Sequence, residues 1–85
     1  TGQNQKAQSD MDALLAKHPE NIILILGSAQ IDIDARRFGA ALPRLREGLS
    51  LYPGDLPLTL ATTETLIRVG KPSEARKILK DYLRH

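Results

Sequence analysis

The side chains that could do chemistry are few and widely spaced. The two histidines are His18, which precedes Pro19, and His85 at the end of the sequence, and no HExxH motif is present, so their spacing predicts no zinc site. Asp32 and Asp34 are two residues apart, and on a helix their side chains point about 200° apart, which excludes a carboxylate dyad. The glycines occur singly, so no phosphate-binding loop is expected. The sequence therefore predicts no catalytic residue, no cofactor and no metal site.

Four arginines, at positions 36, 37, 44 and 46, lie close together in the sequence. They could contact RNA, which is the alternative function, but no aromatic residues alternate with them as single-strand binding requires, and Glu47 lies beside them. We interpret them as a solvated charge cluster. The chain has no cysteine for a disulfide or thiolate metal site, a net charge of +2, and no apolar run long enough to span a membrane.

A 34-residue period runs through the sequence. It relates the following residues: Ala7, Ala41 and Ala75; Pro19 and Pro53; Leu45 and Leu79; Leu49 and Leu83. A period of this length is typical of a helical repeat architecture.

Apolar spacing predicts five helices, over residues 5–17, 22–35, 39–51, 56–69 and 72–84. Asn21 and Asp55 are the expected N-caps, and Gly70 is the expected end of the fourth helix. The alternation of isoleucine and aspartate over residues 31–34 resembles a strand, but the repeat copy 34 residues later has helical spacing, so we predict a helix. Pro43 is expected in or just after the first turn of its helix, where a missing N–H costs little.

With this period and these helix pairs, the chain resembles the tetratricopeptide repeat (TPR) family. The residues at matching family positions are Ala7, Ala41, Ala75, Pro19, Pro53, Gly70, Phe38 and Gly48. The residues that depart from the family pattern are Arg36, Pro72, Leu14, Tyr82, Ile25, Thr59, Asp32 and Leu66, the last four standing where first helices usually carry large aromatics. The resemblance implies an all-α superhelical solenoid, with a half repeat at residues 1–18, a full repeat at 19–52 and a nearly full repeat at 53–85.

Residues 51–60 and 68–75 are similar to the C-terminal repeats of bacterial periplasmic zinc metalloproteases. In that family an HExxH catalytic domain precedes a TPR tail, and its members tend outer-membrane protein assembly. Pro57 is the most distinctive match. This resemblance implies a non-catalytic tail in the periplasm that docks on its parent's catalytic domain. A start at Thr1 without methionine, and an end at His85 within a helical pattern, are what we expect of a piece of a longer protein.

In TPR arrays the first helices of successive repeats line a peptide groove. The equivalent positions here are Ile23, Leu26, Gln30, Ile33, Asp34, Pro57, Leu60, Glu64, Ile67 and Arg68. Carboxylate-clamp TPRs place Lys, Arg and Asn on these faces, whereas this groove is largely apolar. It predicts a protein partner with an apolar segment or an amphipathic helix, unless the rest of the parent protein covers it.

The two end helices are expected to be incompletely covered. Helix 5–17 lacks its repeat partner, and the last helix leaves Ile78, Tyr82 and Leu83 without a following helix. Because covering apolar surface gains about 25 cal/mol per Å², a homodimer through these ends is a further expectation.

Overall fold

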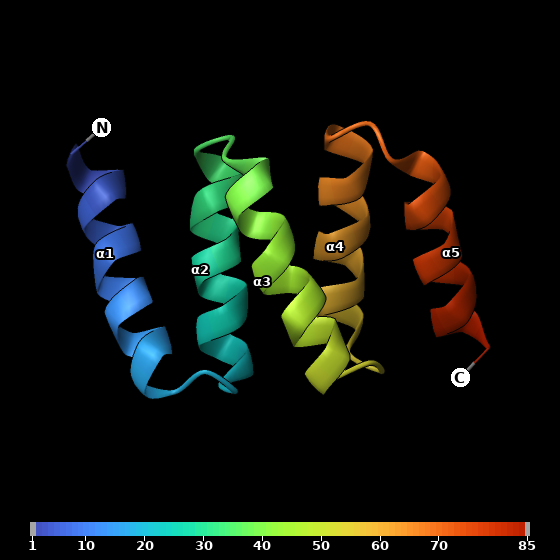
Figure 1. The fold of residues 1–85 in the computed structure, drawn as a ribbon, viewed down its shortest axis with the longest axis horizontal. Coiled ribbons are helices and arrows are strands. Elements are labelled where there is room, and N and C mark those ends of the chain that lie inside the picture. Colours follow the sequence, from blue (N-terminus) through green and yellow to red (C-terminus); the bar gives the residue numbers. More distant parts are fainter. Residues whose placement is uncertain (1, 85) are drawn as a thin grey trace.

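The computed structural model describes residues 2–84, and over these residues the chain is a row of five helices without a strand (Figure 1). The helices are α1 Gly2–Lys17, α2 Ile22–Asp34, α3 Phe38–Leu51, α4 Leu56–Arg68 and α5 Pro72–Leu83. Each helix runs antiparallel to the one before it, and the Cα atoms fill a slab of 39 × 26 × 14 Å. The predicted all-α helical repeat fold is confirmed.

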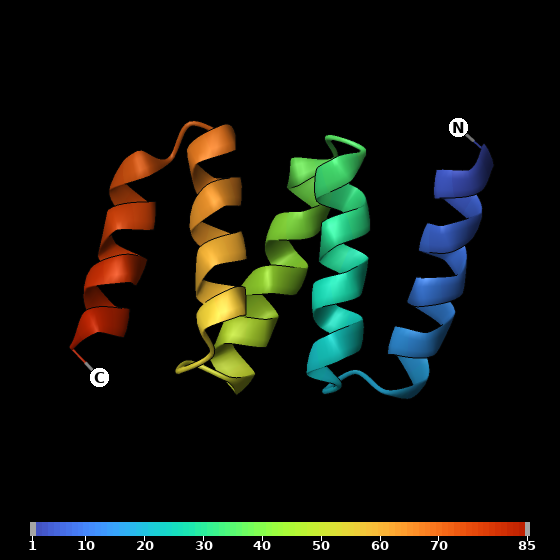
Figure 2. The same ribbon diagram turned by 180° about the vertical axis from the view of Figure 1, so that it is seen from behind.

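The slab has two different faces. In Figure 1 the start of α3 lies in front of α2 and its end in front of α4, and in the reverse view of Figure 2 parts of α2 and α4 lie in front of α3. The backbones of α2 and α4 also approach each other directly. We call the surface formed by these two helices the α2–α4 face.

Side chains and backbone geometry set the helix ends largely where the sequence predicts them. The Asn21 side chain accepts hydrogen bonds from the N–H groups of Ile23 (3.0 Å) and Leu24 (3.2 Å), and Asp55 accepts one from Leu58 N–H at 2.9 Å. Gly70 follows α4 with a φ of 81°. Both predicted caps and the glycine stop are therefore confirmed.

Three local predictions need comment. Residues 31–34 are helical, as the repeat copy indicates. Phe38, expected in a turn, is the first residue of α3. Pro43 is consequently the sixth residue of α3, and the expectation that its missing N–H costs little is wrong, since an N–H there would bond to the Gly39 carbonyl. Because Gly39 and Pro43 are both exposed, water can satisfy that carbonyl.

The main core lies where α2, α3 and α4 meet. Its fully buried members are Ile25, Ala29, Ala41, Leu45 and Leu58. Gly48 allows this close approach, since a Cβ there would lie 2.9 Å from Leu58 Cδ2 and 3.1 Å from Ile25 Cγ2. A buried leucine contributes about 1.5–3 kcal/mol, so this cluster is the main apolar stabilisation of the row.

Helix α4, which is covered by neighbours on two sides, uses threonines where a core helix usually has larger apolar residues. Thr59, Thr62 and Thr65 are buried, and each donates its hydroxyl to the backbone carbonyl four residues earlier, at 2.7–2.8 Å. The hydroxyls are thus satisfied within α4 itself, and the methyl groups remain free to pack against α3 and α5.

The turn after α2 stores backbone strain that a substitution can release. Arg36 has a φ of 62° and stands 34 residues before Gly70, which has the same left-handed conformation. A side chain with a Cβ is disfavoured there. Arg36→Gly is therefore expected to raise the free energy of unfolding by about 0.5–1 kcal/mol, and Gly70→Ala to lower it by about 1 kcal/mol.

Urea denaturation followed by circular dichroism measures both changes as shifts of the midpoint, with the dependence of the free energy of unfolding on urea concentration unchanged. Arg36→Ala is the control, because it removes the guanidinium but keeps Cβ. A gain in stability with Arg36→Ala equal to that with Arg36→Gly would show that the side chain, not the backbone, is the source of the effect.

Candidate functional site

The ends of α2 and α4 nearest the inter-helix turns enclose a hollow of about 220 Å³ on the α2–α4 face. Five of the predicted groove residues line it: Gln30, Ile33, Asp34, Glu64 and Arg68. Gln30 Nε2 donates to Asp34 Oδ1 at 2.8 Å, which orients that carboxylate along α2. The hollow thus presents acidic and basic groups side by side.

The other predicted groove residues continue the same stripes away from the hollow. Ile23 (75% exposed), Leu60 (52%) and Ile67 (59%) are well exposed, Pro57 is exposed, and Leu26 is half-buried against the core. Residues three or four apart share one side of a helix. Ile23 and Leu26 therefore extend the line of Gln30 and Ile33, and Leu60 extends the line of Glu64.

Two residues that line the hollow are absent from the sequence-based prediction. Arg36 enters from the turn after α2, and Phe38 from the first turn of α3. Arg36 and Phe38 are close to Asp34 in the sequence, and this could have identified them, because a tight turn keeps its residues close to the end of the helix that it follows. With two arginines, Arg36 and Arg68, and two carboxylates, Asp34 and Glu64, the lining charges balance.

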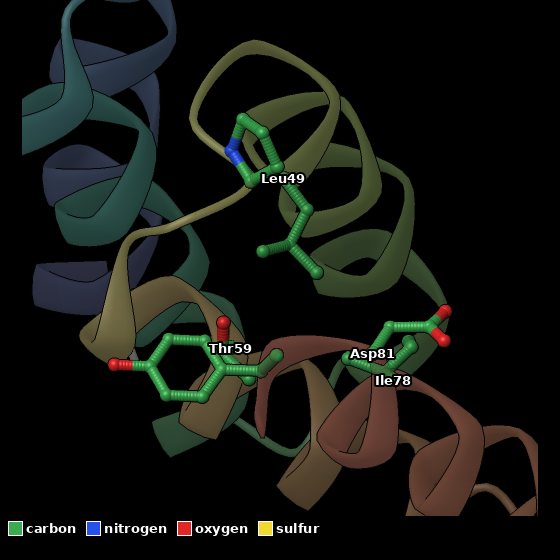
Figure 3. Close-up of a pocket in the computed structure, with 6 residues that line it drawn as sticks. Leu49, Thr59, Ile78 and Asp81 are labelled. Carbon is green, nitrogen blue, oxygen red and sulfur yellow. The ribbon is translucent and has the colours of Figure 1, made fainter. Parts of the chain in front are cut away.

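A second hollow, of about 300 Å³, lies between α3, α4 and α5 (Figure 3). Figure 3 shows Leu49 of α3, Thr59 of α4 and Ile78 of α5 around it, with Asp81 at its edge. Tyr82 also lines this hollow, so its ring is turned toward α3 and α4. The sequence-based prediction of an uncovered Ile78 and Tyr82 is thus wrong in part: both are half-buried here.

A buried polar network joins α1, α2 and α3 and holds the first half of the row together. Asp32 is buried, and its two carboxylate oxygens face Arg37 Nε at 3.1 Å and Arg44 Nε at 3.5 Å. Arg44 reaches on to Asp12 of α1 at 2.6 Å and donates to the hydroxyl of buried Ser28. Gln8 of α1 donates to the same hydroxyl at 3.0 Å. Because these bonds converge on the buried side chains of Asp32 and Ser28, they fix how α1 sits on α2 and α3.

Arg36, Arg37 and Arg46 are exposed, as the solvated cluster predicted from the sequence requires, whereas Arg44 is half-buried. Arg37 and Arg44 bind Asp32, as described, while Arg46 makes two hydrogen bonds to the Glu74 carboxylate of α5, at 2.7 and 2.9 Å. Arg36 lines the hollow of the α2–α4 face. Three of the four guanidinium groups are therefore paired with carboxylates, Arg37 and Arg44 at Asp32 of α2 and Arg46 at Glu74 of α5.

Two carboxylates have altered acidity. Burial acts to raise the pKa of Asp12, but hydrogen bonds from Arg44, Gln8 and Ser28 outweigh it, and the pKa lies below its ordinary value of 3.8. The hydrogen bonds from Arg46 lower the pKa of Glu74 from its ordinary value of 4.5. Both carboxylates are thus held in their ionised form by an arginine of α3.

Within residues 2–84, no three His, Cys, Asp or Glu side chains gather where they could hold a metal ion. His18 is exposed just after α1, and His85 lies outside the described residues. None of the described helices combines the length and the apolar character that crossing a membrane requires.

Comparison with known proteins gives one match. A family model described as tetratricopeptide repeat matches residues 32–85, more than half of the chain, from the last turn of α2 through α5. No curated protein and no solved structure matches the chain.

The buried network can be tested against the repeat that follows it. Thirty-four residues after Asp32 and Arg44 stand Leu66 and Ile78, so the second repeat is apolar where the first is charged. Introduced singly, Asp32→Leu leaves Arg44 with Asp12 as its one carboxylate partner, and Arg44→Ile leaves buried Asp32 with Arg37 alone. Each single substitution is expected to lower the free energy of unfolding by about 1.5–3 kcal/mol. The double substitution is expected to fall within about 1 kcal/mol of the parent. Urea denaturation of the parent, the two single variants and the double variant measures the coupling free energy between positions 32 and 44. If the effects of the two single substitutions simply add in the double variant, the coupling is contradicted.

Acid sensitivity follows from the two lowered pKa values. A carboxyl whose pKa is lower in the folded state stabilises the fold above its unfolded pKa, and this stability is lost as pH falls through the folded pKa. The contribution of Glu74 is therefore complete above pH 4.5 and that of Asp12 above pH 3.8, and both decline below these values. The double variant Asp12→Asn, Glu74→Gln is expected to lose less stability than the parent as pH falls below these values. Thermal melting temperatures measured across this pH range test this. Asp10→Asn, an exposed site on α1, controls for charge removal; an equal effect of Asp10→Asn would refute the assignment.

Proposed function

The chain belongs to the tetratricopeptide repeat family, and we propose that it is a protein-binding scaffold whose α2–α4 face holds an apolar segment or amphipathic helix of a partner. Repeats of this family bind proteins. We also propose its division into a half repeat at 1–18, which holds α1, and repeats at 19–52 and 53–85. The equal, left-handed turns at Arg36 and Gly70 support this division.

The single observation that carries the proposal is the exposure of Ile23, Leu60 and Ile67 beside the charged hollow. Exposed apolar side chains in line with a hollow are typical of surfaces that bind other proteins. The balanced charges of Asp34, Glu64, Arg36 and Arg68 favour a ligand that is apolar along most of its length and carries a charged or polar group at the hollow.

A finer proposal concerns the parent protein. Pro57 lies in the first turn of α4, where the Asp55 cap and the missing proline N–H are compatible, and this join is what resembles the tails of periplasmic zinc metalloproteases. On this proposal the α2–α4 face docks on an HExxH catalytic domain in the bacterial periplasm. Titration of the chain with the isolated catalytic domain of such a protease, by isothermal calorimetry, tests it. Saturable binding that Leu60→Asp abolishes supports it, and absence of binding counts against it.

RNA contact through the arginines remains the alternative function, but it receives little support from their arrangement. Arg37, Arg44 and Arg46 are engaged by carboxylates, so a continuous basic surface is not formed by this stretch. If RNA were the ligand, binding of a single-stranded RNA probe would depend steeply on salt and would weaken when these arginines are replaced by alanine.

The groove proposal predicts which substitutions abolish partner binding. Peptides selected from a phage-displayed library against the whole chain are expected to carry apolar residues at helical or alternating spacing, and Leu60→Asp is expected to weaken them at least roughly tenfold. Arg46→Ala is expected to leave binding unchanged. Affinities come from fluorescence anisotropy of labelled peptides.

Leu14→Asp is the matched control, since Leu14 is an exposed leucine of α1 outside the α2–α4 face. Circular dichroism checks that each variant folds. If Leu14→Asp weakened binding as much as Leu60→Asp, or if Leu60→Asp had no effect, the α2–α4 face would not be the binding surface.

A further inference from the structure

Helix α5 repeats the apolar pattern of α3, but within residues 2–84 no helix covers its outer side as α4 covers α3. On α3, Leu45 is fully buried beneath α4, and Leu49 is half-buried. The residues 34 positions later are Leu79, which is 36% exposed, and Leu83, which is 80% exposed. The same register thus places two leucines in solvent at α5 that are covered at α3.

These leucines lie in a trough on the outer side of α5. Its lining runs from the start of the helix to its end and comprises Ser73, Arg76, Lys77, Leu79, Lys80 and Leu83. A helix of this length extends about 18 Å, so the trough is long enough for three turns of a second helix. We call this surface the α5 outer face.

The charge of the α5 outer face has one sign. Three cations line the trough and no carboxylate does. The two acids of α5 face elsewhere, because Glu74 is held by Arg46 of α3 and Asp81 lines the hollow between α3 and α5 (Figure 3). A partner that covers the leucines would therefore bring acidic side chains next to Arg76, Lys77 and Lys80 at the rim.

Tyr82 does not stand in the way of such a partner. It is the counterpart of Gly48, where the side chain of Leu58 on α4 lies close to the α3 backbone. A tyrosine at this register could have blocked a following helix, but Tyr82 lines the hollow shared with Leu49 and Thr59 instead. The outer face is left to Leu79 and Leu83.

We propose that the α5 outer face binds an acidic amphipathic helix of a partner protein, which lies on α5 as α4 lies on α3. This site is separate from the α2–α4 face and does not depend on the function proposed for that face. The partner contributes apolar residues three or four apart to cover Leu79 and Leu83, and Asp or Glu residues on both flanks to meet the cations.

The structure supplies a template for the probe. Residues 55–70, which hold α4 and its cap, form a peptide that already has the required apolar side. Leu60→Glu, Ile67→Glu and Arg68→Glu make it acidic at positions that are exposed on α4. A control peptide carries Lys at the same three positions. Fluorescence anisotropy of each labelled peptide is measured against the whole 85-residue chain.

The acidic peptide is expected to bind saturably and the lysine peptide to bind at least roughly tenfold more weakly. In the chain, Leu83→Asp is expected to weaken the acidic peptide by roughly tenfold or more, and Lys80→Glu to weaken it several-fold and reduce its salt dependence. Leu60→Asp in the chain, on the other face, is expected to leave this affinity unchanged. Because Leu83 is so exposed, Leu83→Asp should fold normally, and circular dichroism verifies this.

Four outcomes would overturn the proposal: no saturable binding of the acidic peptide, equal binding of both peptides, no effect of Leu83→Asp, or loss of binding with Leu60→Asp instead. Two other occupants are tested in parallel. If the chain does not bind the peptide but sediments with phosphatidylcholine–phosphatidylserine vesicles, and Leu83→Asp abolishes this sedimentation, the face binds a lipid surface. A dimer seen by light scattering that Leu83→Asp dissociates, again without peptide binding, would assign it to a second copy of the chain.

Discussion

The arrangement of α2, α3 and α4 depends on the close approach of side chains to Gly48. Because no side chain projects from α3 at this point, Leu58 of α4 and Ile25 of α2 can both reach the α3 backbone. That double contact encloses Leu45 completely and brings α2 and α4 next to each other beyond α3. The α2–α4 face is therefore a consequence of a missing side chain on the opposite helix. The surface that we propose for binding therefore depends on the packing of α2 and α4 against α3, because this packing sets the positions of both helices.

The two helix pairs differ in the residues that they place at equivalent positions. In the first pair, Asp32 and Arg44 form a charged link that extends to Asp12 of α1, whereas the second pair has Leu66 and Ile78 at the equivalent positions. A buried charge is costly unless it is fully partnered, but its partners must then lie in one orientation. We infer that the network specifies how α1 is placed, which apolar contacts through Met11 and Gly27 would define less sharply. Helix α5 is instead placed by apolar packing on α4 and by the exposed pair of Arg46 and Glu74.

The sequence predicted the fold and the helix ends well, because both depend on local signals that repeat every 34 residues. The caps at Asn21 and Asp55 and the stop at Gly70 are examples in which one side chain or one φ angle decides the outcome. The partners of the arginines could not be predicted, since Asp12 and Glu74 are 32 and 28 residues away from Arg44 and Arg46 and belong to helices whose rotation is set by packing. Of the residues that line the hollow on the α2–α4 face, Arg36 and Phe38 were missed, because they come from the turn after α2 and from α3 and not from the two helices expected to form the groove. The predicted groove residues are placed by the structure, but their role in binding stays a prediction.

A slab only 14 Å thick across its Cα atoms leaves every helix with at least one exposed side, so exposure by itself does not distinguish one surface from another. Charge does. The hollow of the α2–α4 face is lined by two carboxylates and two guanidinium groups, whereas the trough on α5 has three cations and no acid. A strongly acidic helix would meet balanced charges at the first surface and net attraction at the second. On the two proposals made above, the two surfaces therefore select ligands of different charge and do not compete for one partner.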